Sequence, residues 1–204
     1  MVYLDNAATT QVSTAATDAA VHAMRQQFGN PSSLHHLGIE AEGLLRETRE
    51  KLAEKLSASK NEFIFTSGGT EGNNLAIFGA AHARARRGRH IITSMVEHAS
   101  VLTPMRELEK EGYRVTYLPP EELSPEGVMA ALCDDTILIS IMHVNNEVGT
   151  IYPVPEIALM IKRRQPEVLI HTDAVQAFLK VPISLRDGTI DLLTVSGHKI
   201  HAPK

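Results

Sequence analysis

A short run of small and polar residues opens a predicted helix at Ser67-Gly68-Gly69-Thr70, and such a run could bind a phosphate group. Glycines leave backbone N–H groups accessible, the hydroxyls add donors, and the start of a helix carries partial positive charge. The run is neither a P-loop, since no Gly-Lys-Ser/Thr follows it, nor a Gly-x-Gly-x-x-Gly turn. A tight strand-to-helix turn would need the same glycines, so both interpretations stay open for this run by itself.

Asp173 and His98 carry side chains that suit a flat heterocyclic ligand. Asp173 follows a predicted buried strand, and a lone buried carboxylate needs a cationic or protonated partner, such as a protonated ring nitrogen. The imidazole of His98, which follows Glu97 at another strand end, could stack on an aromatic ring. Both residues also have structural interpretations, a helix cap for Asp173 and a hydrogen-bonded core histidine for His98. The amides of Asn145 and Asn146 could orient a polar ligand or form a turn.

Lys199 follows closely after another predicted buried strand, and its amine could act as a nucleophile. In a partly desolvated, positively charged setting the pKa of a lysine falls, and the neutral amine can form a Schiff base. A solvated loop lysine is the commoner case. The company of a phosphate-binding turn, a carboxylate and a histidine changes that balance, because these groups together with a lysine can hold pyridoxal phosphate.

Helices and strands alternate along the sequence, and they must position these residues. Apolar residues spaced three and four apart predict helices, and short apolar runs predict strands. The predicted helices are residues 13–28, 39–56, 71–87, 100–111, 124–132 and 155–164, and the predicted strands are residues 62–65, 91–95, 114–118, 137–143, 168–172 and 192–195.

The apolar runs are mostly continuous, which is typical of strands buried on both faces of a parallel sheet. The alternation therefore predicts an α/β fold with a mainly parallel sheet flanked by helices. Ligands bind at the carboxyl ends of the strands in such sheets. The polar clusters that follow the predicted strands therefore predict a single site; they are residues 66–71, 97–98, 145–147, Asp173 with Gln176, and 196–199.

Composition excludes several classes of protein. The 204 residues include 20 Lys and Arg against 24 Asp and Glu, a net charge of −4, which argues against a main role in binding nucleic acid or an anionic membrane. We expect neither a signal peptide nor a membrane span.

The single cysteine, Cys133, excludes a disulfide framework and fits a reducing compartment. Its acidic neighbours favour a structural role. His35-His36 and the pair His198 and His201 lack further ligands at usual spacings, so no metal site is expected.

In combination, the motifs resemble those of the cysteine desulfurases, the pyridoxal-phosphate enzymes that supply sulfur for iron–sulfur clusters. Any one motif would be weak evidence of kinship, but together they are highly specific and run in the order of the family along the whole chain. The matching segments are residues 3–10, 29–33, 65–74, 97–98, 143–149, 171–176 and 196–204.

The resemblance implies a role for each candidate residue. Lys199 would form the Schiff base and shuttle protons, and Asp173 would keep the pyridine nitrogen protonated. His98 would stack on the ring, and Asn30 would reach the substrate carboxylate. Lys204 is a rival Schiff-base candidate, but it lies beyond a proline and away from the strand end. The other implied contacts are Gln176 at the phenolic oxygen, Asn146 at the ring or substrate, and Gly69, Thr70, Ser196 and His198 at the phosphate.

The resemblance also implies the large domain of the fold-type I pyridoxal-phosphate-dependent transferases, incomplete in this chain. Residues 1–204 would supply an N-terminal segment and most of that domain. In the family, the second half carries the sulfur-accepting cysteine, an arginine that binds the substrate carboxylate, and a small C-terminal domain. Cys133 does not match the sulfur-accepting position.

The implied reaction converts L-cysteine to L-alanine and passes the sulfur, through an enzyme persulfide, to a scaffold or carrier protein for iron–sulfur cluster assembly. A cytoplasmic homodimer, or a complementary C-terminal chain, would complete the enzyme, and we expect the isolated chain to be inactive. Two alternatives stay open. One is another class V enzyme, such as an aminotransferase, a selenocysteine lyase or a kynureninase-like hydrolase; the other is a non-catalytic module that binds the cofactor.

Overall fold

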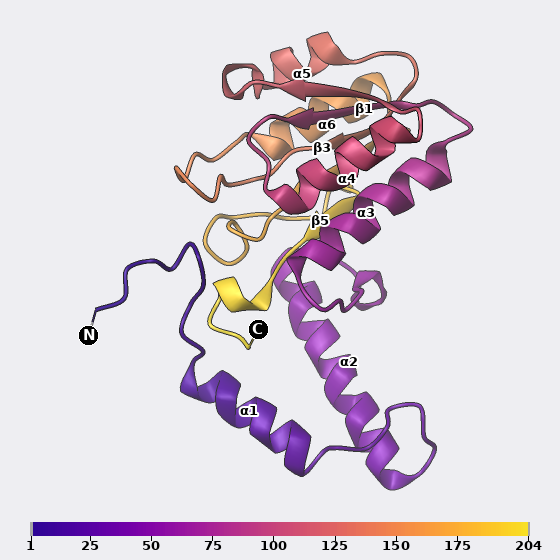
Figure 1. Ribbon diagram of the computed structural model, residues 1–204. Coiled ribbons are helices and arrows are strands. Elements are labelled where there is room, and N and C mark those ends of the chain that lie inside the picture. The colour runs from indigo at the N-terminus through magenta and orange to yellow at the C-terminus, as the bar shows by residue number, and fades with distance from the viewer. Residues whose placement is uncertain (1, 204) are drawn as a thin grey trace. The chain divides into compact units, whose positions relative to one another are not determined.

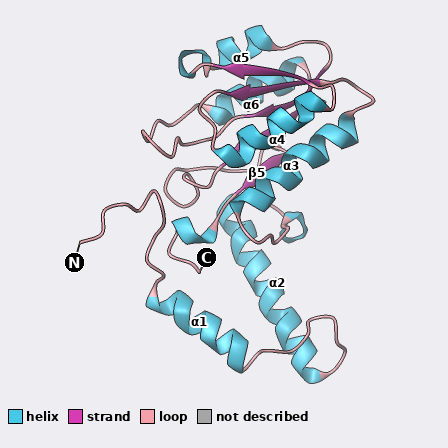
Figure 2. Cartoon of the chain, in the orientation of Figure 1, coloured by secondary structure: helices cyan, strands magenta, loops and turns pink. Residues whose placement is uncertain are grey.

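The computed structural model describes residues 2–203, and their contacts divide them into two compact units. The first unit comprises the described residues up to Phe65, the segment Ser184–Arg186, and the described residues from Gly197 onward. The second unit comprises Thr66–Ile183 and Asp187–Ser196. All of the strands, drawn in magenta in Figure 2, lie within the residue ranges of the second unit, whereas helices and loops make up the first.

The second unit is built on a parallel sheet with the strand order β2-β1-β3-β4-β5. Every residue of β1 and β3 is buried, which explains why these strands read as continuous apolar runs rather than alternating ones. The strands are β1 (His90–Ser94), β2 (Arg114–Leu118), β3 (Thr136–Ser140), β4 (Leu169–Asp173) and β5 (Leu192–Thr194).

Helices cover both faces of this sheet because the chain moves in opposite directions from β1. The connection to β2 and the later connection to β3 and β4 run to opposite sides, and right-handed crossovers then place their helices on opposite faces. Figure 1 shows α3 and α4 packed together on one side of the strands and α6 on the other, next to α5. These helices are α3 (Gly69–Arg84), α4 (Ala99–Lys110), α5 (Pro125–Ala131) and α6 (Val154–Arg164).

Local sequence signals explain where α5 begins. Ser124 is the N-cap of α5, where its Oγ accepts a hydrogen bond from the Gly127 N–H at 3.1 Å, and Pro125 occupies the first turn.

On the sheet side, Ile77 of α3 and Met105 of α4 are completely buried in the same core. The predicted α/β fold with a parallel sheet flanked by helices is therefore confirmed for this unit.

The first unit contains α1 (Thr14–Arg25), α2 (His36–Leu56), the short 3₁₀ turn η1 (Lys60–Glu62) and a second such turn, η3 (Gly197–Lys199). The Leu185 N–H donates to the carbonyl of Leu56 at 2.8 Å and joins the segment 184–186 to the end of α2. Across residues 2–203, none of the helices has both the length and the apolar character needed to cross a membrane.

The predicted strand at residues 62–65 is wrong. Glu62 ends η1, where its carboxylate accepts from the Ser59 N–H at 2.7 Å, and the residues that follow join no sheet. The guanidinium of Arg49 in α2 instead binds the Phe63 carbonyl and lies 4.8 Å from the centre of the Phe65 ring. This apolar run is therefore held by a helix rather than paired with a strand.

Candidate functional site

Asp173 is the centre of a buried hydrogen-bond network in the second unit. It ends β4, is only 6% exposed, and accepts hydrogen bonds from Asn73 Nδ2 at 2.7 Å and from the Val175 N–H at 2.9 Å. Asn73, which lies on α3 and is completely buried, also donates to Ser100 Oγ at 2.9 Å. Donors on both oxygens favour the anionic form of the Asp173 carboxyl group and fix its orientation.

His98 connects to the same network through Ser100. It is the N-cap of α4, where its Nδ1 accepts from the Ser100 N–H at 3.1 Å and lies 2.7 Å from Ser100 Oγ. A path of hydrogen bonds therefore runs from His98 through Ser100 and Asn73 to Asp173. The structure brings together the two residues that we predicted to contact the faces and nitrogen of a flat ring.

The sequence had indicated no role for Asn73 or Ser100. One signal could have revealed Asn73: it lies four residues before Ile77, on the buried stripe of α3. A polar residue on an otherwise apolar helix face must find a hydrogen-bond partner in the interior. Only the fold shows that this partner is Asp173, which lies one hundred positions further along the chain.

The start of α3 lies beside the end of β5. A Cβ added to Gly69 would lie 3.1 Å from Val175 Cγ2 and 3.7 Å from the Cβ of Ser196, so Gly69 and Ser196, two predicted phosphate contacts, are close to one another. Gly68 caps α3 without a side-chain hydrogen bond, and Thr70 in the first turn is exposed. The turn follows no strand of the sheet, contrary to our expectation, but it does lie at the predicted edge.

Glu97 links the chain segments that leave β1 and β3. Its Oε1 accepts from Ser94 Oγ at 2.6 Å and from the Met142 N–H at 2.8 Å. Burial raises the pKa of Glu97 to about 8, against the opposing effect of these two hydrogen bonds. In the sequence, Glu97 stood out only as the neighbour of His98.

Asn145 forms the turn that we considered for Asn145-Asn146. Its Oδ1 accepts from the N–H groups of Glu147 and Val148 at 2.9 and 3.0 Å. Asn146 is half-buried beside it, and its contact with a cofactor or substrate stays a prediction. The same is true of Gln176, which is half-buried after β4 and accepts from Lys180 Nζ at 3.4 Å.

Lys199 and His198 belong to the first unit, where residues near the N-terminus contact them. Lys199 Nζ donates to the carbonyls of Ala7 and Ala8, the latter at 2.8 Å. The His198 carbonyl accepts from the Thr10 N–H at 2.9 Å. This interaction of the lysine segment with residues 7–10 was not foreseen. Lys204, the rival lysine, lies outside the described residues.

Asn30 precedes α2 in the first unit and forms a local turn. Its Oδ1 accepts from the Ser32 N–H at 2.9 Å, and its carbonyl accepts from the Ser33 N–H at 2.9 Å. The side chain is exposed, and its proposed contact with a substrate carboxylate stays a prediction.

Cys133 lies at the opposite end of the sheet. Its N–H donates to Oγ1 of Thr136, the first residue of β3, at 2.9 Å. The surroundings of Cys133 are not only acidic, as expected, but also contain a cation. Arg114 Nη1 lies 3.7 Å from the Cys133 sulfur, and Arg114 Nη2 binds Asp135 at 2.8 Å. His90 has a ligand atom within 4.8 Å of those of Cys133 and Asp135, but the Arg114 guanidinium already binds both of these partners.

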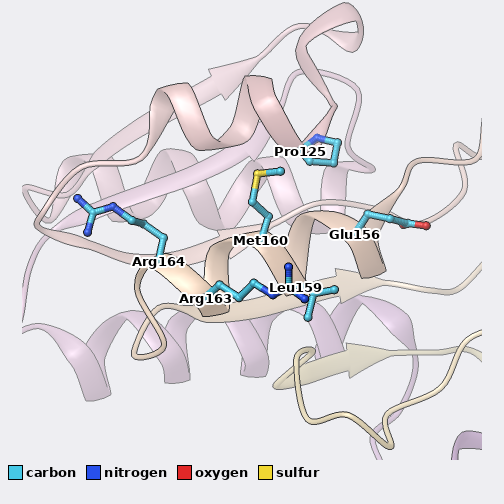
Figure 3. A pocket seen from close by; sticks show the side chains of 6 residues that line it. All are labelled: Pro125, Glu156, Leu159, Met160, Arg163 and Arg164. Atoms are coloured by element: carbon cyan, nitrogen blue, oxygen red, sulfur yellow. The ribbon is translucent and has the colours of Figure 1, made fainter.

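A groove of about 420 Å³ lies on the outer side of α6, where α5 begins (Figure 3). Figure 3 shows the Met160 side chain pointing toward Pro125. No candidate site residue lines this groove, so it is separate from the carboxyl edge of the sheet. Its lining residues are Pro125, Glu156, Leu159, Met160, Arg163 and Arg164.

The fold and these networks define an α/β protein with a candidate ligand site at the carboxyl edge of a parallel sheet. The sequence profile of the aminotransferase class-V family matches residues 2–204, and the chain belongs to that family. It is 47% identical over 206 residues to the cysteine desulfurase IscS of Dictyoglomus turgidum, with 100% of this chain and 52% of the relative covered.

Solved structures agree with this assignment. The chain is similar to a NifS-like protein with a TM-score of 0.94 and 40% identity, over 100% of this chain and 56% of that one. It is equally similar, with a TM-score of 0.94 and 39% identity, to SspA in complex with cysteine, over 100% of this chain and 59% of that one. The chain spans about half the length of the curated relatives that it matches.

Proposed function

We propose that this chain supplies the cofactor-binding part of a cysteine desulfurase that uses pyridoxal phosphate. The family assignment and the names of the relatives support this activity. The SspA structure, which is described as a complex with cysteine, supports L-cysteine as the substrate.

The observation that carries the proposal is the setting of Asp173. Its buried carboxylate is held by Asn73 and by the Val175 N–H, and hydrogen bonds connect Asn73 through Ser100 to His98. An anion fixed in this way suits a protonated ring nitrogen. The accessible start of α3, beside Ser196, suits a phosphate group. The residues of the second unit therefore fit pyridoxal phosphate.

Pyridoxal phosphate supplies an electron sink for the bond at the substrate Cα that must break. Asp173 would keep a proton on the ring nitrogen, and His98 would lie against the ring. Lys199 would hold the cofactor covalently through Nζ and would move the proton of the substrate Cα. The phosphate would be bound by the backbone of Gly69 and by Thr70, Ser196 and His198, with Gln176 and Asn146 at the ring oxygen and Asn30 at the substrate.

The products would be L-alanine and a persulfide on an acceptor cysteine. A sulfur-accepting scaffold or carrier protein, a role in iron–sulfur cluster assembly, a homodimer or a complementary chain, and a cytoplasmic location all belong to this proposal. They rest on the resemblance of the motifs to those of the cysteine desulfurases, whereas the names of the relatives support the desulfurase activity alone.

Pyridoxal phosphate added to the chain should give a visible absorption band that the Lys199→Ala variant lacks. Borohydride reduction should leave the cofactor on a single peptide, the one that contains Lys199. The control variants are Lys51→Ala, an exposed lysine of α2, and Lys204→Ala, the rival residue, and both should keep the band. A band that survives Lys199→Ala would show that the assignment of this lysine is wrong.

Another class V enzyme is the competing function, because the same cofactor residues would serve it. Amino transfer to a keto acid, in place of sulfide release from cysteine, by an enzyme that contains this chain and its complementary half would favour that alternative.

A further inference from the structure

Glu97 is a buried carboxyl group without a role in the proposed reaction, and it lies where the strand order reverses. Because β2 and β3 flank β1 on opposite sides, the segments that leave β1 and β3 diverge at this point. The Glu97 side chain bridges them, since Oε1 accepts from Ser94 Oγ in β1 and from the Met142 N–H after β3.

A second hydrogen bond joins the same two segments. Asn145 Nδ2 donates to the carbonyl of Val96 at 3.2 Å, next to Glu97 in the sequence. The loop of residues 95–98 ends at His98, the cap of α4. Two hydrogen bonds therefore hold this loop against the segment after β3, and the Met95 N–H also donates to the Leu118 carbonyl of β2 at 2.8 Å.

The two oxygens of Glu97 differ in their surroundings. Within residues 2–203, the buried Oε2 has no hydrogen-bond partner, whereas Oε1 accepts two hydrogen bonds. An ionised carboxylate would leave negative charge on this unpaired oxygen in the interior, whereas the uncharged acid would leave one O–H without an acceptor, which costs less free energy, so this arrangement suits the uncharged acid. The negative charge of Asp173 acts in the same direction as burial, and Tyr152 is the other titratable group on which Glu97 acts.

We propose that Glu97 is a positioning residue, an uncharged carboxylic acid that holds the His98 loop against the segment after β3 and leaves Asp173 as the anion for the ring nitrogen. The part that concerns the cofactor rests on the proposed function. Asp173 has donors on both oxygens and Glu97 on one, so the two carboxyl groups are suited to opposite charge states.

The experiment compares the wild-type chain with Glu97→Gln and Glu97→Ala. Thermal unfolding of the cofactor-free proteins is followed from pH 5 to pH 9, and the affinity for pyridoxal phosphate is measured at pH 7. Unfolded Glu97 loses its proton near its ordinary pKa of 4.5, whereas folded Glu97 keeps it until about pH 8. The wild type therefore loses stability, relative to Glu97→Gln, as the pH rises between these two values.

We expect the melting temperature of Glu97→Gln minus that of the wild type to grow steadily from pH 5 to pH 8 and then to level off. The glutamine carbonyl can accept the same two hydrogen bonds, so its affinity for pyridoxal phosphate should stay within about twofold of the wild type. Glu97→Ala removes both bonds and should weaken this affinity about tenfold. The exposed Glu121→Gln should match the wild type in both measurements.

A Glu97→Gln melting profile parallel to that of the wild type would overturn the proposal, as would full cofactor affinity in a folded Glu97→Ala. If Glu97→Ala does not fold, the profile of Glu97→Gln decides alone. If the wild type binds no pyridoxal phosphate, the proposed function fails for this chain, while the melting profiles still test the uncharged state of Glu97.

Discussion

Asn73 donates one hydrogen bond to Asp173 and another to Ser100, so one uncharged side chain orients two groups of the candidate site. Its own Oδ1 is buried without a partner among the residues that the structure describes. Burying this oxygen without a partner costs free energy. The two hydrogen bonds that the Asn73 amide donates must offset that cost, which indicates that they matter for the site.

Replacing Asn73 by Ala should weaken the affinity for pyridoxal phosphate about tenfold, because Asp173 would lose one of its donors and its fixed orientation. Titration of the cofactor-free chain with pyridoxal phosphate measures this effect. The control is Thr136→Val, which removes the hydrogen bonds of Thr136 Oγ1 with His90 and with the Cys133 N–H at the other end of the strands. It should lower the melting temperature without changing the affinity. Equal affinity losses in both variants would mean that Asn73 acts through stability alone.

Single residues differ in how far the sequence could reveal them. Asp173 was a candidate because a lone buried carboxylate needs a cationic or protonated partner, and Lys199 became one through the company of a phosphate-binding turn, a carboxylate and a histidine. Asn73, Ser100 and Glu97 were not, because their hydrogen-bond partners lie far from them in the sequence or in another segment.

Among the elements, α3 contains two glycines, Gly72 and Gly79, that follow its first residue Gly69 and differ in their surroundings. A Cβ on Gly72 would lie 2.9 Å from Cγ2 of the buried Thr194, whereas a Cβ on Gly79 would meet nothing within 4 Å. Thr194 lies in β5 and its hydroxyl is hydrogen-bonded to His171 of β4 at 3.1 Å. Gly72 therefore allows α3 to approach the sheet closely, beside the candidate site.

Gly72→Ala should destabilise the chain by about 1–2 kcal/mol, because Thr194 must move in a packed interior. Gly79→Ala should stabilise it by about 0.5–1 kcal/mol, since alanine favours the helix and its methyl group has room. Urea unfolding of the two variants measures both changes. Stabilisation by Gly72→Ala as large as that by Gly79→Ala would show that α3 does not need this close approach.

Five of the six predicted strands and all six predicted helices are confirmed, most of them with shifted ends. The apolar pattern predicted the elements of the second unit because each buries one side, or both, in its core, whereas α1 of the first unit shows an apolar period although none of its residues is buried. The run at 62–65 misled the prediction because its composition matches a strand while its partner is Arg49 of α2. Whether an apolar run joins a sheet depends on residues far from it in the sequence, and a local pattern does not contain them.

For the whole molecule, the single cysteine is at the wrong end of the sheet to accept sulfur. Cys133 is bound to Thr136, where β3 begins, whereas the second unit's candidate residues lie beyond the carboxyl ends of the strands. The four steps along β3 from Thr136 to Ser140 alone cover about 13 Å. A sulfur atom at the candidate site is therefore out of reach of this thiol.

The purified chain, supplied with pyridoxal phosphate and L-cysteine, should release no alanine and transfer no sulfur, because the proposed reaction requires an acceptor thiol at the site. Alanine formation and sulfide release after addition of a reducing thiol measure this directly, with Cys133→Ser as the matched variant. Turnover that disappears in Cys133→Ser would show that Cys133 reaches the substrate and that the argument from the two ends of β3 is wrong. Turnover that persists in that variant would show that an added thiol can replace the missing cysteine, and that the chain binds and activates cysteine by itself.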